Sequence, residues 1–461
     1  MTIKPYHSCE YSSWQDMVFG RSLHPIKAGF DVEIGAGAVI PELKYAPRPG
    51  REKDLNTLME EYQRITRDAL DRIVGIGAPA IVMELEHVFQ LTDKVEWGRE
   101  IAHRTKWLLK EYYDRYGLKG ALRATIADIR KPENGLWDSP EYIKILNGMK
   151  ASAEAGADIL SIESIGGKEV FNYAVTRQDI RGVVFAVGIL GSLDMAHLWS
   201  DIVSIAEQQG VLPGGDTDCA HSNTAMFMAG GLMETQLPHT FAALVRPAGA
   251  VRSLVAFEAG ATGPDKDCGY EGVILKAITG KPISMEGKTS ACAHSDLMGN
   301  LSAAVCDLWS NEAVEYGEMF GGTTPQVFAE MLAYDCAQMN ASLQMGCADT
   351  MRDVLITSDR NRDPQALVLS PDVAMDIAAV IVNEKGYYKR TVRAMQRAAE
   401  IIASSDRSGE LPLSENEREA LDSCRKALDE LPEDEEQFMK ECIQIYSQSV
   451  PEFRAKNYGI N

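Results

Sequence analysis

The sequence predicts an α/β fold, and a TIM-type (β/α)8 barrel that need not be regular is favoured over a doubly wound sheet. Two observations carry this prediction. Apolar runs of strand length alternate with helical patterns from about residue 53 to residue 279, which is typical of a parallel sheet with helices outside it. Polar or thiol side chains also follow several predicted strands, and the carboxyl ends of barrel strands meet at one face. A functional site is therefore expected at that face.

The individual elements follow from local signals. Apolar residues from Leu55 to Ile73 recur at helical spacing, and Gly75 and Gly77 end that helix. Ser139-Pro140 is typical of a helix N-cap and first turn. The predicted elements, in order, are a helix over about 53–75, a strand over 80–85, a helix over 95–116, a strand over 122–128, a helix from Ser139-Pro140, a strand over 157–162, a helix over 168–176, a strand over 182–190, a helix over 193–209, a strand over 210–215, a helix over 221–234, a strand over 251–259 and a helix over 269–279.

These elements make six strand–helix units, whereas a full barrel needs eight strands. The missing strands must lie in the region 281–345, although its apolar spacing is mostly that of helices. The short run Ile283-Ser-Met285 is a strand candidate there. Residues 1–50 are rich in glycine and proline and are interpreted as irregular, with a loop or small hairpin near Gly35-Ala-Gly37. The full G-x-G-x-x-G of a dinucleotide loop does not occur there.

The chain is expected to divide into three parts. An N-terminal extension covers 1–52, the barrel covers 53–365, and a helical segment packed on the barrel covers 366–461. In the last part, Ser370-Pro371 opens one helix, and Ser414-Glu-Asn-Glu417 is a capping box that opens another. Leu421, Cys424 and Leu428 lie on one side of that second helix.

Composition excludes several classes of function. The chain has 461 residues and a formal net charge of −21, so it repels phosphate backbones and nucleic acid is an unexpected partner. The nine cysteines are spread singly, without C-x-x-C, which favours a reducing compartment over a disulfide framework. The N-terminus lacks an apolar signal core, and no uninterrupted apolar run approaches the roughly 20 residues of a membrane span. A soluble cytoplasmic protein is expected.

The pattern D-x-D-C occurs twice, as Asp216-Thr-Asp218-Cys219 and as Asp265-Lys-Asp267-Cys268. Each copy follows a predicted strand and precedes a helical pattern, so the two thiols are expected at neighbouring strand ends, where they favour a metal site. A single cysteine would be interpreted as a buried core residue. Glu163, which ends the predicted strand 157–162, is the candidate third ligand. Zinc accepts thiolate and carboxylate ligands, and a catalytic zinc site has three protein ligands and one open position.

Asp218 and Asp267 immediately precede the two cysteines. They either orient the ligands or deliver a proton, or they only stabilise turns. His221 is a possible fourth ligand, which would make the site a closed, structural one. Glu84 and Asp128 close earlier strands and are candidates to line the same mouth.

Three runs carry a resemblance to a known family: Ser161-Ile-Glu163-Ser-Ile-Gly, Gly214-Gly-Asp-Thr-Asp-Cys219-Ala-His and Pro264-Asp-Lys-Asp-Cys268-Gly-Tyr. The chain resembles the zinc-containing methanol:corrinoid methyltransferases of methanogenesis over essentially its whole length. The resemblance implies a TIM-type barrel with extra helices and one Zn²⁺ held by Glu163, Cys219 and Cys268. It also implies a complex with a separate corrinoid-carrying protein, and transfer of the methyl group of methanol to the Co(I) of that partner's corrinoid.

Two other functions stay open. Zinc with two thiolates and one carboxylate carries one net negative charge, which suits activation of a thiol better than activation of methanol. A zinc-dependent thiol or methylamine methyltransferase is therefore an alternative, distinguished by a substrate assay. A barrel subunit with structural zinc is the non-enzyme alternative. For the methanol reaction, Asp218 or Asp267 is the hypothetical proton donor to the departing oxygen.

Overall fold

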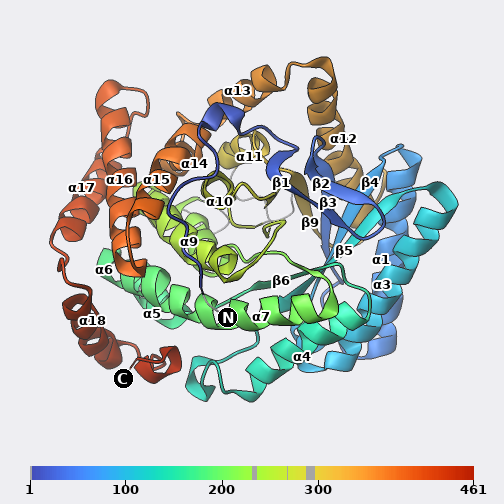
Figure 1. Ribbon diagram of the computed structural model, residues 1–461, viewed down its shortest axis with the longest axis horizontal. Helices are drawn as coiled ribbons and strands as arrows, with labels where there is room; N and C mark the ends of the chain where they lie inside the picture. Colours follow the sequence, from blue (N-terminus) through green and yellow to red (C-terminus); the bar gives the residue numbers. More distant parts are fainter. Residues whose placement is uncertain (1–2, 231–235, 267, 287–295, 461) are drawn as a thin grey trace.

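The core of the protein is one curved parallel sheet of seven strands (Figure 1). The computed structural model describes residues 3–230, 236–266, 268–286 and 296–460. Within them, the strands lie in the order β7-β6-β5-β4-β3-β9-β8, and every neighbouring pair is parallel. Their bounds are β3 Ile40–Ala46, β4 Ala80–Glu86, β5 Lys119–Ala127, β6 Ile159–Glu163, β7 Leu212–Pro213, β8 Ser284–Glu286 and β9 Leu308–Val314.

An extended segment, residues 262–265, connects the two edges of this sheet. The backbone N–H groups of Thr262 and Gly263 donate to Pro213 O and Gly214 O, at 2.9 and 3.1 Å. On the other side, Asp265 N donates to Pro282 O at 3.0 Å, just before β8. The segment thus takes the sixth of eight strand positions and closes the sheet into an irregular barrel. The predicted α/β barrel fold is confirmed.

A helix follows each strand position and packs outside the barrel, as right-handed β-α-β connections require (Figure 1). The eight principal helices are α1 Leu55–Gly75, α3 Val95–Tyr116, α4 Pro140–Glu154, α7 Ser192–Gln209, α9 His239–Ala259, α10 Gly272–Thr279, α11 Asp296–Ala303 and α12 Thr324–Met345. Shorter helices, α2 Phe89–Asp93, α5 Lys168–Val175, α6 Ile180–Val183 and α8 Thr224–Gly230, lie in the connections. The predicted helices over 53–75, 95–116 and 193–209 are confirmed, and Ser139 caps α4 through a hydrogen bond from Tyr142 N.

Two predicted strands, 182–190 and 251–259, are wrong. Residues 184–191 form a π-helical turn that runs into α7, and 251–259 are the second half of α9. Both stretches are buried around their whole circumference, so they show a continuous apolar run in which helical periodicity disappears. Residues Ile180–Gln209 and His239–Ala259 are even long and apolar enough to cross a membrane by length and composition. However, 83% and 100% of those windows are buried inside the protein, as in core helices.

Two strands, β3 and β9, were not predicted from the sequence. β3 lies inside the segment expected to precede the barrel, and β9 lies in the region read mostly as helix. Both place polar side chains inside the barrel, such as Glu42 and Lys44 on β3 and Ser310 on β9, all of them buried. The near-continuous apolar run expected of a parallel strand is therefore interrupted. The short strand candidate at Ile283-Ser-Met285 is confirmed as β8.

The amino-terminal end of the barrel is closed by a hairpin, so of the two alternatives predicted here, a loop or a small hairpin, the structure has the hairpin. Its strands, β1 Arg21–Ala28 and β2 Val32–Ala36, pair antiparallel. Apolar side chains of the hairpin and of the first inward layer of the barrel form one buried cluster, Ala28, Val32, Ile34, Ile40, Val82, Ala121, Ile159 and Leu308. Substrate access is therefore expected at the opposite end, where the strands have their carboxyl ends.

The C-terminal part is helical and covers one side of the barrel (Figure 1). Its helices are α13 Ala348–Asp359, α14 Pro364–Leu369, α15 Pro371–Asn383, α16 Tyr387–Ser408, α17 Glu415–Asp429 and α18 Glu435–Ser449. α16 and α17 pack on α9, and α15 packs on α10. Ser370 and Ser414 take the N-cap positions of α15 and α17, as predicted, and Leu421, Cys424 and Leu428 are the buried face of α17. The predicted capping box at Ser414 is only half formed, because the Glu417 carboxylate accepts from His239 N and Thr240 N at the start of α9.

The last residues of the chain reach back to α5. The Tyr458 hydroxyl donates to Glu169 Oε1 at 2.7 Å and accepts from Gly167 N at 2.8 Å. The other carboxylate oxygen of Glu169 is buried and finds no hydrogen-bond partner in the described part of the chain. Burial raises the pKa of Glu169 to about 7, although the Tyr458 hydroxyl opposes this.

We expect Glu169→Gln to stabilise the protein above neutral pH and to have a smaller effect at pH 5. Between the ordinary pKa of 4.5 and about 7, the folded state holds a proton that the unfolded state releases. The stability from this group is thus complete below pH 4.5 and is lost as pH rises through 7. Glutamine cannot ionise and avoids this loss. The free energy of unfolding of the variant should therefore exceed that of the wild type by an amount that grows with pH to about 1–3 kcal/mol. Urea unfolding at pH 5 and 8 measures it, with the exposed Glu452→Gln as control. A pH-independent difference would contradict this assignment.

Candidate metal centre

The three predicted ligands meet at the carboxyl-terminal face of the barrel. Glu163 is the last residue of β6, Cys219 begins the helical turn Cys219–Asn223 after β7, and Cys268 follows the extended segment 262–265. One donor atom from each, a carboxylate oxygen and two sulfurs, lies within 4.8 Å of the other two. Cys268 Sγ is 3.2 Å from Glu163 Oε1. Residues separated by up to 105 positions are thus arranged as one donor group.

Hydrogen bonds between the two D-x-D-C loops hold the cysteines side by side. Gly269 N donates to Thr217 Oγ1 at 2.8 Å, and Asn223 Nδ2 donates to Cys268 O at 2.7 Å. Asp218 N donates to Glu271 Oε1 at 2.5 Å. Each loop therefore forms hydrogen bonds at or close to the other loop's cysteine.

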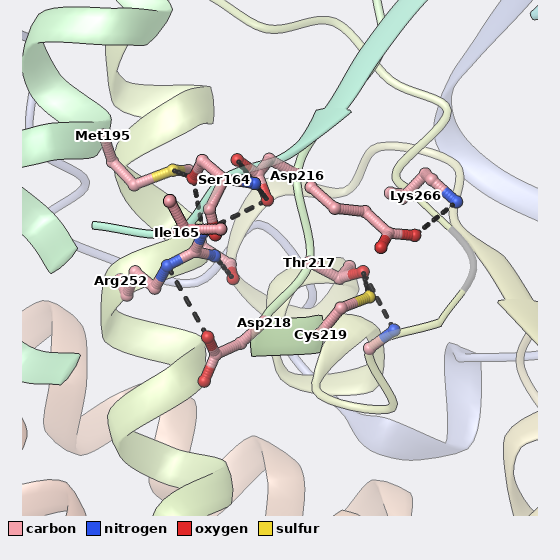
Figure 2. A network of polar contacts seen from close by, with 12 residues as sticks. Ser164, Ile165, Met195, Asp216, Thr217, Asp218, Cys219, Arg252 and Lys266 are labelled. Carbon is pink, nitrogen blue, oxygen red and sulfur yellow. Dashed lines mark hydrogen bonds and ion pairs between the residues drawn. The ribbon is translucent and has the colours of Figure 1, made fainter. Parts of the chain in front are cut away.

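Asp218 is buried and anchors the turn that carries Cys219. Its Oδ2 accepts from Ser222 N and Ser222 Oγ, at 3.2 and 2.7 Å, as an N-cap does. Its Oδ1 lies 2.5 Å from His221 Nδ1 and 3.6 Å from Arg252 Nε. Figure 2 shows the guanidinium of Arg252 directed at both Asp216 and Asp218, and its Nη2 is 3.2 Å from Asp216 Oδ1.

This environment keeps Asp218 ionised. Burial by itself raises the pKa of Asp218, but His221, Arg252 and the Ser222 hydroxyl outweigh it and lower the pKa below its usual range. A carboxyl group that stays deprotonated has no proton to donate to a departing oxygen. Asp267, the other candidate acid, lies outside the described residues. His221, considered as a fourth ligand, has its Nδ1 on Asp218, and its ring packs edge-on against Phe171 at 4.9 Å.

Two buried lysines, which sequence analysis missed, lie against the donor group. Lys44 Nζ is 3.1 Å from both Cys268 Sγ and Glu163 Oε1. Lys266 Nζ is 3.2 Å from the same Glu163 oxygen and 2.6 Å from Glu84 Oε1. Lys266 is the variable residue of the second D-x-D-C, whereas Lys44 lies on β3, a strand that was not predicted. Burial lowers the pKa of Lys44, but Cys268, Glu163 and nearby glutamates outweigh it and raise the pKa well above its ordinary value.

Further carboxylates line the mouth. Glu84, one of the two carboxylates predicted from the sequence to line the mouth, lies there and contacts Lys266. Asp128, the other, instead pairs with Arg130 at 2.7 Å and accepts from Ile165 N at 3.0 Å. Cys268 also belongs to a second donor group, with Glu286 and Glu312, within the same 4.8 Å limit. The group with two thiols is the softer of the two and fits zinc better.

The donor group is reachable from solvent on one side. The Glu163 side chain is 27% exposed, and Cys219 is half-buried, whereas the two lysines behind them are buried. Burial raises the pKa of the Cys219 thiol to about 12, so a metal ion that binds there must displace a proton. The arrangement can hold a soft cation with one side free for a small molecule.

A closed β/α barrel with reactive side chains at the carboxyl ends of its strands defines a barrel enzyme that acts at that face. The family model described as "Methanol-cobalamin methyltransferase B subunit" matches residues 3–459. The chain belongs to this family, and it is a methyltransferase.

Two relatives agree over the full length. A curated protein of Methanosarcina barkeri (strain Fusaro / DSM 804), "Methanol--corrinoid protein co-methyltransferase", is 49% identical over 461 residues, covering 100% of both chains. A chain in the crystal structure of the methanol:cobalamin methyltransferase complex MtaBC from Methanosarcina barkeri is 48% identical. It superposes with a TM-score of 0.96 and covers 99% of this chain and 100% of its own.

Proposed function

We propose that this protein transfers the methyl group of methanol to the Co(I) corrinoid of a partner protein in methanogenesis from methanol. We further propose that Glu163, Cys219 and Cys268 hold one Zn²⁺ for this reaction. The family match over nearly the whole chain supports the reaction. The observation that carries the zinc site is the convergence of these three donors within 4.8 Å at the barrel mouth.

The donor set fits zinc. Two thiols and one carboxylate are ligands that zinc accepts, and three protein ligands leave a fourth position for substrate. Bound zinc supplies a Lewis acid for the hydroxyl group of methanol. The exposure of Glu163 and Cys219 supports an open, catalytic site rather than a structural one. Among the described residues, His221, which would have closed the site, does not belong to the donor group of Glu163, Cys219 and Cys268.

Asp218 acts in this proposal as a positioning residue. It caps the turn that begins at Cys219, and contacts with Arg252 and His221 stabilise its negative charge. The proton for the departing oxygen then comes from another source. Asp267 stays a prediction from sequence.

The partner's corrinoid must approach the carboxyl-terminal face, because the donor group lies there and the hairpin closes the other end. The active enzyme is therefore a hetero-oligomer with a corrinoid protein, and we place it in the cytoplasm. The barrel takes β3 from segment 1–52, which was expected to precede it, and it works together with the helical segment 366–461. Neither nucleic acid nor a membrane takes part.

The assay that tests this proposal follows methyl transfer from methanol to Co(I) cobalamin by its absorption spectrum, together with the zinc content of the purified protein. We expect about one zinc per chain and methyl transfer from methanol. A methylated thiol and methylamine, as donors, test the alternative methyltransferases. Transfer from one of these but not from methanol would replace the proposed substrate. Zinc without any transfer would favour a structural site.

A further inference from the structure

The proposed site has an electrostatic difficulty. A zinc dication with two thiolates and one carboxylate carries one net negative charge, and such an electron-rich centre is a weak Lewis acid for an alcohol. Glu84 and Glu312 add negative charge close by. Glu84 pairs with Lys266 and Glu312 pairs with Lys44, and both lysines contact the ligand Glu163. Buried charge of one sign is costly unless it is compensated. The fold must therefore supply positive charge near these ligands.

Lys44 and Lys266 supply that charge. The Lys44 side chain is 2% exposed and that of Lys266 is 0% exposed, so both ammonium groups act where water screens them little. Both lie within 3.2 Å of the same oxygen, Glu163 Oε1. Both also donate to Cys268 Sγ, Lys44 at the shorter distance of 3.1 Å and Lys266 at 3.8 Å.

We propose that Lys44 and Lys266 are positioning residues that hold Glu163 and Cys268 and withdraw electron density from them, which suits the metal site to an alcohol rather than a thiol. A hydrogen bond from an ammonium group weakens electron donation by a thiolate or carboxylate to its metal, and partners of this kind tune metal sites generally. Both lysines contact one sulfur and one oxygen ligand, but Lys44 lies closer to the sulfur, so it has the larger effect. This inference rests on the proposed function and specifies how the site selects its substrate.

The test uses the full-length protein with Lys44→Met and Lys266→Met, which keep an unbranched side chain only one atom shorter and remove its charge. Zinc affinity is measured by competition with a chelator. The thiolate-to-metal absorption band is measured after replacing zinc by Co²⁺. We expect Lys44→Met to bind zinc about 10-fold to 100-fold more weakly, because losing the partner that positions both ligands outweighs their stronger electron donation; this is the range for partners of metal ligands. Its cobalt band should move to longer wavelength, because the sulfur loses a hydrogen bond. Lys266→Met should weaken zinc binding less.

Lys276→Met is the matched control. Lys276 is equally buried, but it pairs with Asp307 at 3.0 Å and donates to Val305 O at 2.6 Å, away from the donor group. This variant should lose stability without moving the cobalt band. If Lys44→Met does not fold, Lys44→Gln and Lys44→Arg are measured in the same way. Arginine, which keeps the charge, should retain more zinc affinity than glutamine.

The outcomes separate the two proposals. Wild-type protein that binds neither zinc nor cobalt overturns the proposed metal site. Wild-type protein that binds zinc and methylates cobalamin, with unchanged affinity and cobalt band in Lys44→Met and Lys266→Met, overturns only the role of the lysines. In zinc-loaded Lys44→Met, kcat for methanol should fall at least several-fold, with KM changed less. A change in KM alone would contradict electronic tuning.

Discussion

Replacing Cys219 or Cys268 by alanine is expected to abolish stoichiometric zinc binding and to lower methyl transfer from methanol by roughly a thousandfold or more. Each variant leaves two of the three donors that lie within 4.8 Å of one another, too few to hold the ion. A Lewis acid stabilises a transition state by several kcal/mol, and each loss of about 1.4 kcal/mol is tenfold in rate. Elemental analysis and the cobalamin assay measure both effects on the same samples.

Cys424→Ala is the matched control for these variants. Cys424 is a buried thiol on α17, in the C-terminal helices. Its loss should cost about 1–2 kcal/mol of stability as a small cavity and leave zinc and activity in place. Zinc retained in both Cys219→Ala and Cys268→Ala would show that the repeated D-x-D-C is a pair of turns and not a metal site.

Arg123→Met is expected to destabilise the protein by about 3–5 kcal/mol, the cost of leaving a buried charge without its partner. Arg123 and Glu42 are both 0% exposed inside the barrel, and Arg123 Nε is 2.6 Å from Glu42 Oε1. The same guanidinium donates to Ser161 Oγ on β6, and to Pro264 O and Asp265 O in the extended segment. It thus ties the irregular sixth strand position to β3, β5 and β6, directly below the donor group.

Urea unfolding followed by circular dichroism measures this loss. The double variant Glu42→Leu with Arg123→Met should lose less stability than the sum of the single variants, because no unpaired charge remains. Arg115→Met is the control, since Arg115 is 58% exposed and pairs with Glu111 on the surface of α3. That pair should contribute less than about 1 kcal/mol. Strictly additive losses would contradict the coupling between Glu42 and Arg123.

A residue's role is predictable from sequence where it depends on the residue's neighbours in the chain. Ser139 and Ser414 cap their helices because a short hydroxyl side chain reaches the free N–H groups of the next turn. The strands that became β4, β5 and β6 are apolar and bounded, so they were found. Residues 184–191 and 251–259 are helical although their sequence predicts strands, because burial on all sides removes the periodicity that separates a helix from a strand.

The sequence by itself determined the alternation of strands and helices, the helix caps, and the repeated D-x-D-C that singled out two cysteines. Only the tertiary structure decided which segments complete the barrel, because 262–265 is strand-like solely through hydrogen bonds to Pro213, Gly214 and Pro282. It also decided that Lys44 and Lys266 lie against Glu163. A lysine in a sequence is ordinarily a surface residue. Its burial against distant carboxylates and a thiol follows from strand register and barrel closure, which no local pattern encodes.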